Sequence, residues 1–593
     1  MPAIRAPAWP SPLDNVSTQT SDDQLETEEA INALFSLLRP SRYDFSKDAS
    51  STTPDSAIVN PWLSAAEQDQ QREQAAADKK PAPKPSLLLD RKAHINFLTK
   101  LLEPLPGAYT AFDTNRSWLL YWILHSYDLL SVSLDSKGRA RAIATLLSFQ
   151  NTATGGFGGG PDQIAHLMAT YAAVSALAIV GGPGPAPTPE DVAAGKSVEV
   201  GKGGWDAIDR KKMYEWIMNL KQPDGSFLVH VNGEVDVRAG YCVVCIATML
   251  GISTQELLSG TSSFITSCQT YEGGIAAASQ PTYQQDTNTG DVSLISQDVP
   301  RPPLGEAHGG YTYCAAASYL ALSLLGPSAA TTSASPPSTS LNRDALIRWA
   351  TAQQGIPFEG CAFRGRTNKL VDGCYGWFSG GGLFTVLSAM IEAELIGDKL
   401  HSSTAPSPAS GAEDWNGMLT VPPMPPMYAP ASNEDESSSW KTESTIKSDD
   451  GADDVEDDLS PLTLFDRVGL QEYILVAAQR SAAEGGGLRD KPGKRPDAYH
   501  TCYNLAGLAL SQHSVRLSTE TAKFLHQNFK GEDDWARMTY STMLAWSLSA
   551  RDEVVVEAKE AGEGKSNRLN PAHPVFNITF PKAKGIMDWA YGQ

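Results

Sequence analysis

A helical repeat is the feature that most constrains how this chain can fold. Five times, a helix end leads through a glycine turn into an apolar helix rich in alanine. The turns begin at SFQNTATGGFGGG (residue 148), LKQPDGSF (220), SCQTYEGGI (267), AQQGIPFEGCAF (352) and AAEGGGL (482). The nearest units lie about 50 residues apart, which is a typical period for stacked helical hairpins.

Hairpins of this kind cannot bury their apolar helices alone, so they must pack on one another. Five or six of them would form an all-α domain, either a closed ring of inner and outer helices or an open solenoid. The stretch SWLLYWILHSYDLL (residues 117–130) is hydrophobic on almost every side, which predicts a buried helix. In a ring the glycine turns would gather at one end, and a polar site built from them would lie there.

Residues 1–86 differ in composition from the repeats and are predicted to be an N-terminal extension. One helix is expected at about 21–38, where a capping serine and several acids precede apolar residues at helical spacing. A flexible linker rich in Ser, Pro, Ala and Gln follows it. Residues 87–593 hold the repeats, interrupted by a low-complexity acidic insertion at about 402–461. Stretches at 183–203, 279–304 and 326–342 are predicted to be disordered surface loops.

Charge and cysteine usage bear on the class of protein. The net charge of −21 lies mostly in the N-terminal extension and the acidic insertion, so nucleic-acid binding by the repeats is not expected. The seven cysteines are few and odd in number, which favours a reducing compartment. No leader pattern opens the chain, and the longest apolar run, residues 171–180, is too short to span a bilayer. We expect a cytoplasmic protein that is not an integral membrane protein.

Four polar clusters precede the apolar helices. They read EVDVRAGY (234–241), EAHGGYTY (306–313), RGRTNKLVDGCYGWF (364–378) and GGGLRDKPGKRPDAYHTCY (485–503). Each would sit at a helix N-terminus, where backbone N–H groups favour anions. The clusters offer six basic residues to one region: Arg238, His308, Arg366, Lys369, Lys491 and Lys494. That is enough positive charge for a diphosphate, although solvated loop charge is the simpler interpretation of any single member.

One cluster pair also indicates a metal site. Asp372 and Cys374 can converge from an extended turn, and His500 lies at the corresponding turn of a later repeat. Zinc binds such residues, and a catalytic zinc keeps its fourth position open. The alternative is a buried cysteine, a turn aspartate and a capping histidine.

Two other patterns are rejected as sites. Cys242 and Cys245 form a CxxC within an apolar helix pattern and are expected to pack in the core. The motifs DDGAD (449–453) and DDVED (453–457) match an isoprenoid-synthase pattern but fall in the acidic insertion, where no helix would aim their carboxylates.

Several motifs together resemble the β subunits of protein farnesyltransferases, within the CaaX prenyltransferase β family. They are LKQPDGSF, GEVDVR, EAHGGYT, NKLVDGCY and LRDKPGKRPDAYHTCYNLAGL, with a weaker match at HPVFNIT (573–579). The resemblance spans residue 87 to about 510, with gaps at the insertions. It implies an α/α toroid (an α6–α6 barrel) that pairs with a separate prenyltransferase α subunit. It also implies transfer of the C15 farnesyl group from farnesyl diphosphate to the cysteine of C-terminal CaaX motifs, as in small GTPases.

The resemblance assigns roles to individual residues. It implies one Zn²⁺ held by Asp372, Cys374 and His500, and a diphosphate bound by His308, Arg366, Lys369 and Tyr375. It implies Mg²⁺ with diphosphate at Asp490, Lys491 and Lys494. The isoprenoid cavity would be lined by Arg238, Tyr241, Gly310, Trp118, Phe378 and Tyr503. The peptide would contact Trp118, Trp122, Tyr499 and His166.

The lipid length is inferred from two bulky residues. Trp118 and Tyr503 match the large pair of farnesyl enzymes, whereas geranylgeranyltransferase type I has a smaller residue at the tryptophan position, so we favour C15. The chain departs from the family at Met168 and Ala169, within HLMATY, at Phe378 and at Cys361. These departures bear on peptide selectivity and lipid contacts but not on the metal ligands.

Three further functions are alternatives for a chain with these features. The geranylgeranyltransferase type I β subunit is the nearest alternative. Terpene cyclases share the barrel but need an acidic protonating motif, which no repeat turn carries. A non-enzymatic helical scaffold would bind no zinc. Fold alone does not separate these functions, because one fold hosts many activities.

Overall fold

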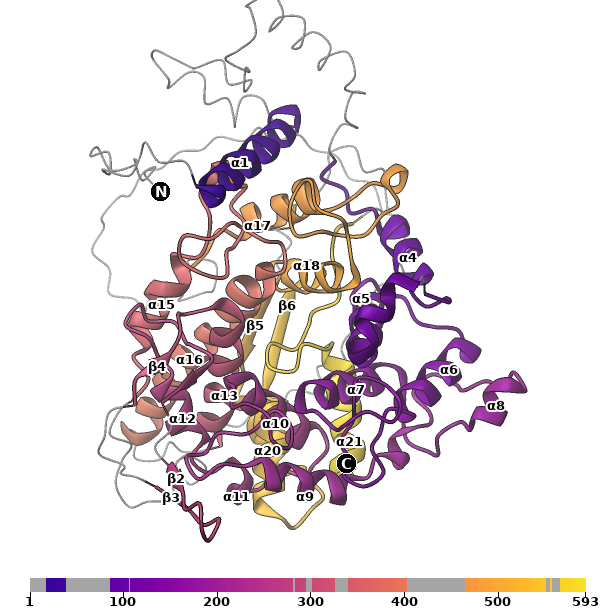
Figure 1. Cartoon of the computed structure of the whole chain (residues 1–593), viewed down its shortest axis with the longest axis vertical. Coiled ribbons are helices and arrows are strands. Elements are labelled where there is room, and N and C mark those ends of the chain that lie inside the picture. Colours follow the sequence, from indigo (N-terminus) through magenta and orange to yellow (C-terminus); the bar gives the residue numbers. More distant parts are fainter. Residues whose placement is uncertain are drawn as a thin grey trace, which may run out of the picture.

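The computed structural model describes residues 18–38, 86–105, 107–280, 283–294, 301–325, 340–402, 464–550, 555–556 and 566–593 (Figure 1). Nearly all of the linker predicted at 40–86 and of the acidic insertion predicted at about 402–461 lies outside these residues. So does most of the stretch 326–342.

Inner helices form a closed ring. In chain order they are α5 (Arg116–Leu129), α7 (Leu167–Val180), α10 (Val237–Met249), α13 (Gly309–Leu324), η5 (Gly376–Gly381) continuing into α16 (Gly382–Ser402), and α18 (Ala498–Ser511). Each contacts the next, and α18 contacts both η5 and α5. Because the last helix returns to the first, the closed ring replaces the open solenoid as the architecture.

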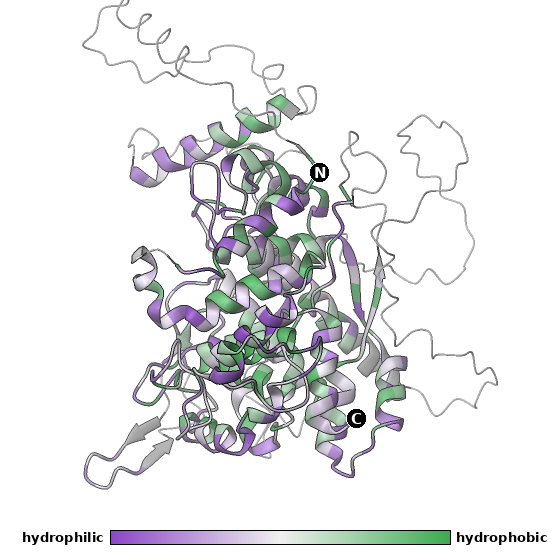
Figure 2. Ribbon diagram, turned by 90° about the vertical axis from the view of Figure 1, so that its right-hand side faces the viewer, coloured by the Kyte–Doolittle hydropathy of each residue, from purple (hydrophilic) through white to green (hydrophobic). Residues whose placement is uncertain are grey.

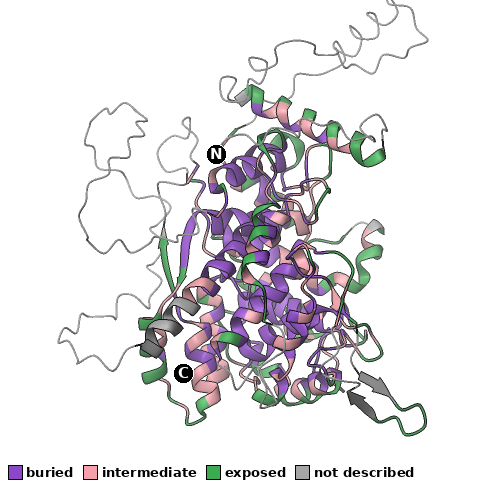
Figure 3. Ribbon diagram, turned by 90° about the vertical axis from the view of Figure 1, so that its left-hand side faces the viewer, coloured by how far each residue is buried: buried purple, intermediate pink, exposed green. Residues whose placement is uncertain are grey.

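Outer helices precede the inner ones and pack around them. They are α4 (Arg91–Lys100), α6 (Ser136–Leu147), α9 (Arg210–Leu220), α12 (Thr261–Ser267), α15 (Arg343–Thr351) and α17 (Arg467–Tyr473), which continues into η8 (Ile474–Ala478). Helix α9 buries Met213, Trp216, Ile217 and Leu220, one face of a helix, whereas α7 is buried almost throughout. Figures 2 and 3 show the same contrast, with hydrophobic and buried residues gathered toward the middle of the molecule.

The glutamines that recur at the repeat turns lie where backbone pairing closes each loop. At five turns an isolated β-bridge closes the loop, pairing Gln150 with Phe157, Lys221 with Phe227, Gln269 with Ile275, Gln354 with Phe363, and Gln479 with Leu488. The glutamine side chains add a second bond: Gln150 Nε2 donates to Gly155 O at 3.0 Å and Gln269 Nε2 to Gly273 O at 2.9 Å. Gln354 Nε2 likewise donates to Cys361 O at 3.0 Å, whereas Gln479 Nε2 donates outside its own loop, to Leu88 O and Leu475 O.

The N-terminal helix predicted at about 21–38 is present as α1 (Gln19–Leu38). It packs on η4 (Pro357–Glu359) and η8, burying Ile31 and Phe35. Gln24 Nε2 donates to Glu359 Oε1 at 3.0 Å, which ties the helix to the turn that leads toward Asp372.

Two of the predicted surface loops contain short regular elements, which the sequence analysis did not predict. Within 279–304 lie the antiparallel pairs β1 (Ala278–Ser279) with β4 (Pro303–Leu304) and β2 (Tyr283–Gln285) with β3 (Val292–Leu294). Within 183–203 lies α8 (Pro189–Ala193), which has a Thr188 capping box. Strands of two or three residues are too short to show an alternating pattern in sequence.

The C-terminal region adds elements that the repeat did not predict. Strands β5 (His513–Leu517) and β6 (Trp546–Ala550) pair antiparallel, and α19 (Thr519–Gln527) and α20 (Asp534–Met543) lie between them in sequence. Helix α21 (Phe580–Tyr591) packs against α7 and α10. The remaining short helices are η2 (Gly107–Asn115), η3 (Trp205–Ala207), α11 (Gln255–Leu258) and η9 (Ala482–Glu484).

None of the helices in the described ranges combines the length and the apolarity needed to cross a membrane.

A buried histidine makes the stability of this fold pH-dependent. His94 on α4 is fully buried; its Nδ1 accepts from Gly487 N–H at 3.0 Å, and its Nε2 lies 3.1 Å from Gln479 Oε1. Since Nδ1 accepts a hydrogen bond, the ring is neutral, and burial lowers the pKa of His94 to about 4. The unfolded chain therefore binds this proton first. Stability from this group is complete above pH 6.5 and is lost as the pH falls toward 4.

We expect His94 to remove about 1.4 kcal/mol from the free energy of unfolding for each pH unit between 6.5 and its folded-state pKa of about 4. Denaturant titrations at pH 7.0 and 5.5 measure this change. The variant His94→Gln should lose less stability over the same interval than the parent protein. Equal losses in both proteins would contradict a role for His94.

Candidate functional site

Polar residues cap the inner helices at one repeated position. His166, Asp236, His308 and Asp497 are the N-caps of α7, α10, α13 and α18, and each side chain accepts a backbone N–H of its own helix. In the turn before η5, Asp372 Oδ1 accepts Cys374 N–H at 2.9 Å, although the N-cap of η5 itself is Tyr375. Capping places these side chains beside the positive ends of several helices, at one end of the ring. The prediction that the clusters lie at helix N-termini is confirmed.

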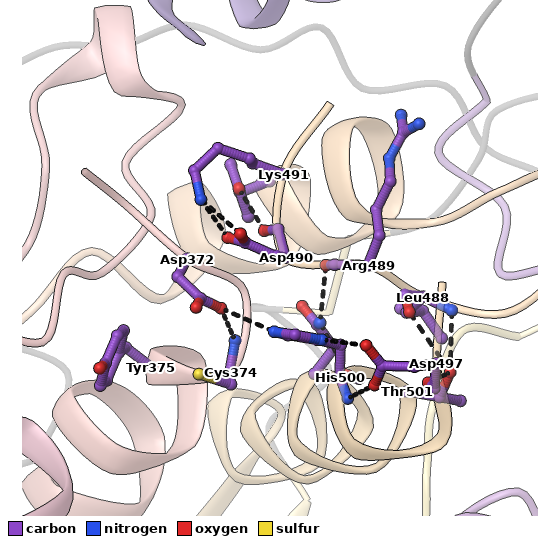
Figure 4. Close-up of polar contacts among 12 residues, drawn as sticks. Asp372, Cys374, Tyr375, Leu488, Arg489, Asp490, Lys491, Asp497, His500 and Thr501 are labelled. Atoms are coloured by element: carbon purple, nitrogen blue, oxygen red, sulfur yellow. Dashed lines mark hydrogen bonds and ion pairs between the residues drawn. The ribbon is translucent and has the colours of Figure 1, made fainter. Parts of the chain in front are cut away.

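The predicted metal ligands come together. The ligand atoms of Asp372, Cys374 and His500 all lie within 4.8 Å of one another, and Asp372 Oδ1 is 3.5 Å from His500 Nε2 (Figure 4). Cys374 is buried, and the other two are half-buried. A carboxylate, a thiol and an imidazole that face one point form a donor set suited to zinc.

Close backbone packing holds the two loops of this cluster together. Gly373 N–H donates to Asp490 O at 2.8 Å, and Tyr473 OH donates to the same oxygen at 2.9 Å. A Cβ at Gly373 would lie 2.5 Å from the amide of Asn504, so only glycine permits this approach. Asn504 in turn donates to His500 O at 2.8 Å. The glycine between Asp372 and Cys374 is therefore part of the site.

The electrostatics of the cluster favour a cation. Burial and the charge of Asp372 raise the pKa of the Cys374 thiol well above its usual value. Burial alone would lower the pKa of His500, but hydrogen bonds with Asp372 and Asp497 raise it to about 10. Burial would raise the pKa of Asp372, yet the hydrogen bond and charge of His500 hold it below its usual value. His500 is therefore protonated in the absence of a metal, and a divalent metal ion would supply the positive charge in place of that proton.

Asp497 is a site residue that the sequence analysis missed. His500 Nδ1 lies 2.6 Å from Asp497 Oδ2, while the other carboxylate oxygen accepts His500 N–H at 2.8 Å (Figure 4). This contact orients the ring so that Nε2 faces Asp372. The signal was an aspartate three residues before a histidine at a predicted helix start, which is an N-cap pattern.

We expect Asp497→Asn to weaken metal binding about 10- to 100-fold, because a carboxylate behind a metal-binding histidine orients it and raises its basicity. Titration with Zn²⁺ against a chelator measures the affinity. Asp209→Asn is the matched control, since Asp209 caps α9 through Lys212 N–H. Unchanged affinity in Asp497→Asn would leave Asp497 as a helix cap alone.

A second group lies around His308. Its Nδ1 accepts Gly310 N–H at 3.0 Å, and its Nε2 lies 3.0 Å from Tyr375 OH. Burial and the charges of Arg366 and Arg238 lower the pKa of His308 to about 4, so the ring is neutral. Nε2 therefore carries the proton and donates it to Tyr375 OH. A Cβ at Gly365 would lie 2.1 Å from the Tyr375 ring, so glycine is required there too.

The predicted basic residues differ in their ion-pair partners and in their exposure. Arg366 forms an ion pair with Glu306, and Lys491 pairs with Asp490. Arg238 pairs with Asp236 and stacks at 5.1 Å over Tyr311, which is 4.9 Å from the His308 ring. Lys369 and Lys494 are exposed, and among the described residues neither forms an ion pair within this group. Burial and the charge of Asp372 raise the pKa of Asp490.

Aromatic rings from all the inner helices form a closed belt. Its members in order are Trp118, Trp122, Tyr499, Tyr503, Phe378, Tyr313, Tyr241 and Tyr171, and neighbouring ring centroids are 4.4 to 5.9 Å apart. Tyr499 also lies 5.0 Å from the His500 ring. Every aromatic residue predicted to contact lipid or peptide belongs to this aromatic belt. Gly310 lies in the first turn of α13, and His166 is 5.4 Å from the His230 ring.

Tyr171 and Tyr313 were missed as belt members. A repeat signal could have found them: both, like Tyr241, stand five residues after the capping residue of their inner helix. Side chains at this position point into the ring, because the hydroxyls of the three tyrosines donate to the backbone of residues 574–576.

Comparison with known proteins gives consistent matches. The family described as "Prenyltransferase alpha-alpha toroid domain" matches residues 89–578. The β subunit of protein farnesyltransferase from Pyricularia oryzae is 31% identical over 94% of this chain and 83% of its own length. The β subunit from Pisum sativum is 32% identical over 79% of this chain and 87% of its own length. The β subunit of geranylgeranyl transferase type 1 from Arabidopsis thaliana is 27% identical over 50% of this chain and 72% of its own.

Proposed function

This chain belongs to the family of protein farnesyltransferase β subunits, and from that premise we propose its activity. It would transfer a farnesyl group from farnesyl diphosphate to the cysteine of a C-terminal CaaX motif, as the catalytic subunit of a heterodimer with a prenyltransferase α subunit. The observation that carries the proposal is the Asp372–Cys374–His500 cluster, which adjoins the aromatic belt through Tyr499.

Asp372, Cys374 and His500 would hold the zinc ion. When bound, Zn²⁺ stabilises the thiolate form of the substrate cysteine at neutral pH. Asp497 holds the His500 ring so that Nε2 remains directed at the site. The raised pKa of the Cys374 thiol fits this assignment, because a buried thiolate needs a cation beside it.

In the reaction, the substrate sulfur forms a bond to C1 of the farnesyl group as the bond from C1 to the diphosphate oxygen breaks. Negative charge then grows on the departing diphosphate, and fixed donors lower the barrier by binding it. Neutral His308 donates to the Tyr375 hydroxyl, so the proton of that hydroxyl remains available to the diphosphate. Arg366 and Lys369 add positive charge. Exposed Lys369 would approach only when the diphosphate is bound.

Asp490, Lys491 and Lys494 would bind Mg²⁺ and diphosphate together. Burial and the charge of Asp372 raise the pKa of Asp490, so an added cation would stabilise its carboxylate beyond the ion pair that it forms with Lys491. Bound Mg²⁺ would neutralise diphosphate charge. Burial of Lys491 strengthens its interaction with anions by excluding water.

The aromatic belt would form the wall of the lipid and peptide sites. Trp118, Phe378, Tyr241 and Tyr503 present rings suited to an apolar isoprenoid, and Trp118 restricts its length by bulk. Trp122 and Tyr499 lie on the side of the belt nearest the metal cluster, where the CaaX peptide would bind, with His166 near its last residue. The proposal includes a cytoplasmic location, where cysteines remain reduced.

The test is a transfer assay read by mass spectrometry. The chain is co-expressed with an α subunit and offered a CaaX peptide with equal farnesyl and geranylgeranyl diphosphates, before and after chelation of metal. The same peptide with serine for cysteine is the control. Farnesyl addition that chelation abolishes supports the proposal. Geranylgeranyl addition would agree with the mechanism but contradict the argument from Trp118 and Tyr503 on lipid length. If a folded complex transferred neither lipid, a non-enzymatic helical scaffold would be the better interpretation.

A further inference from the structure

Four tyrosines bind one short stretch of backbone. Residues 574–577, here called the interior segment, run between the inner helices inside the ring, visible as the yellow coil at the centre of Figure 1. Its four consecutive carbonyls accept hydrogen bonds from four consecutive inner helices. Tyr313 donates to Pro574 O at 2.8 Å, Tyr241 to Val575 O at 2.8 Å, Tyr171 to Phe576 O at 2.9 Å and Tyr121 to Asn577 O at 2.7 Å.

These bonds fix where the interior segment lies. The segment is not part of a helix or strand, and it is closed at its base by His573 N–H donating to Ile578 O at 2.7 Å. Its residues are buried, and a buried carbonyl without a partner is costly. All four tyrosines are buried as well. Each of these hydrogen bonds therefore fixes the position of one carbonyl of the segment and the position of one tyrosine ring inside the barrel.

Two of these tyrosines also support Trp118. The Trp118 ring lies 5.8 Å from Tyr121, edge-on, and 5.7 Å from Tyr171. Trp118 is thus packed against two rings whose far ends are tied to Phe576 O and Asn577 O. Neither ring can move away from Trp118 without breaking the buried hydrogen bond that its hydroxyl makes with the interior segment.

We propose that the interior segment and the hydroxyls of Tyr121 and Tyr171 determine prenyl length by holding Trp118 in place. This inference rests on the proposed function, and it makes Tyr121 and Tyr171 positioning residues that act through Trp118. Removing either hydroxyl leaves a carbonyl without its donor, so the ring and the segment can shift. Trp118 then loses its support, and a longer chain can be accommodated.

The experiment uses the full heterodimer with Tyr171→Phe and, independently, Tyr121→Phe. Both keep the aromatic ring and remove only the hydroxyl. Tyr591→Phe is the matched control, because Tyr591 OH donates to a backbone carbonyl, Thr248 O, at 3.0 Å and lies outside the aromatic belt. kcat and KM are measured for farnesyl and geranylgeranyl diphosphates with one CaaX peptide. Thermal unfolding establishes that each variant is folded.

We expect the ratio of kcat/KM for the C20 over the C15 diphosphate to rise about tenfold in both variants, mainly through KM for the C20 lipid. It should not change in Tyr591→Phe. An unchanged ratio in folded Tyr171→Phe and Tyr121→Phe, or an equal rise in Tyr591→Phe, would overturn the proposal. If the parent protein transfers neither lipid, the proposed function fails; competition binding of the two diphosphates then still measures length selection in the same variants.

Discussion

Replacing His500 by alanine is expected to remove the bound metal and to lower peptide farnesylation by more than about a hundredfold. Substituting a residue that only orients a metal ligand costs about 10- to 100-fold, so loss of the ligand itself must exceed this. Without the imidazole, Asp372 and Asp497 also lose their shared partner. Metal content by mass spectrometry and single-turnover transfer rates measure the two effects.

Two controls separate loss of the ligand from loss of the fold. His526→Ala removes an exposed histidine from α19 and should leave both measurements unchanged. His500→Ala should still bind farnesyl diphosphate, because the aromatic belt and the His308 group remain. If His500→Ala kept full metal content and full activity, the metal-ligand assignment would be wrong.

Replacing Tyr375 by phenylalanine is expected to lower kcat about 10²- to 10³-fold. This is the usual effect of removing one fixed donor to a charge that develops in the transition state. The phenylalanine ring keeps its packing against Gly365, so the loop geometry should persist. The substitution removes only the hydroxyl, which accepts a hydrogen bond from His308 Nε2.

Steady-state kinetics with saturating peptide measure this change. kcat and kcat/KM should fall together, because the hydroxyl acts on the leaving diphosphate rather than on the bound substrate. Tyr319→Phe, a half-buried tyrosine of α13, is the matched control. A rise in KM with unchanged kcat would instead assign Tyr375 to ground-state binding.

Local patterns in the sequence were sufficient for much of this protein. The glycine turns and the apolar helices after them predicted the hairpins, since helical amphipathicity depends on residues three and four apart. The capping positions of Asp372, His308 and Asp497 are likewise local. Residues close in sequence, such as Asp372 and Cys374, could be proposed as a pair, and His500 was placed with them because it lies at the corresponding turn of a later repeat.

Contacts between distant segments were not predictable in this way. Whether the hairpins close into a ring depends on α18 reaching α5, far apart in sequence. The belt needs that closure, because Trp122 meets Tyr499 only across it. The same holds for the short strands within 279–304, which are stabilised by pairing rather than by their own pattern.

The sequence by itself determined the repeat, the inner and outer helices, and the residue types at each cap, because all of these follow from local hydrogen bonding and the periodicity of apolar residues. Only the tertiary structure decided that the ring closes and that four tyrosines bind residues 574–577. Both features join segments that are hundreds of residues apart: α18 packs against α5, and Tyr121 donates to Asn577 O, a bond that no local pattern specifies.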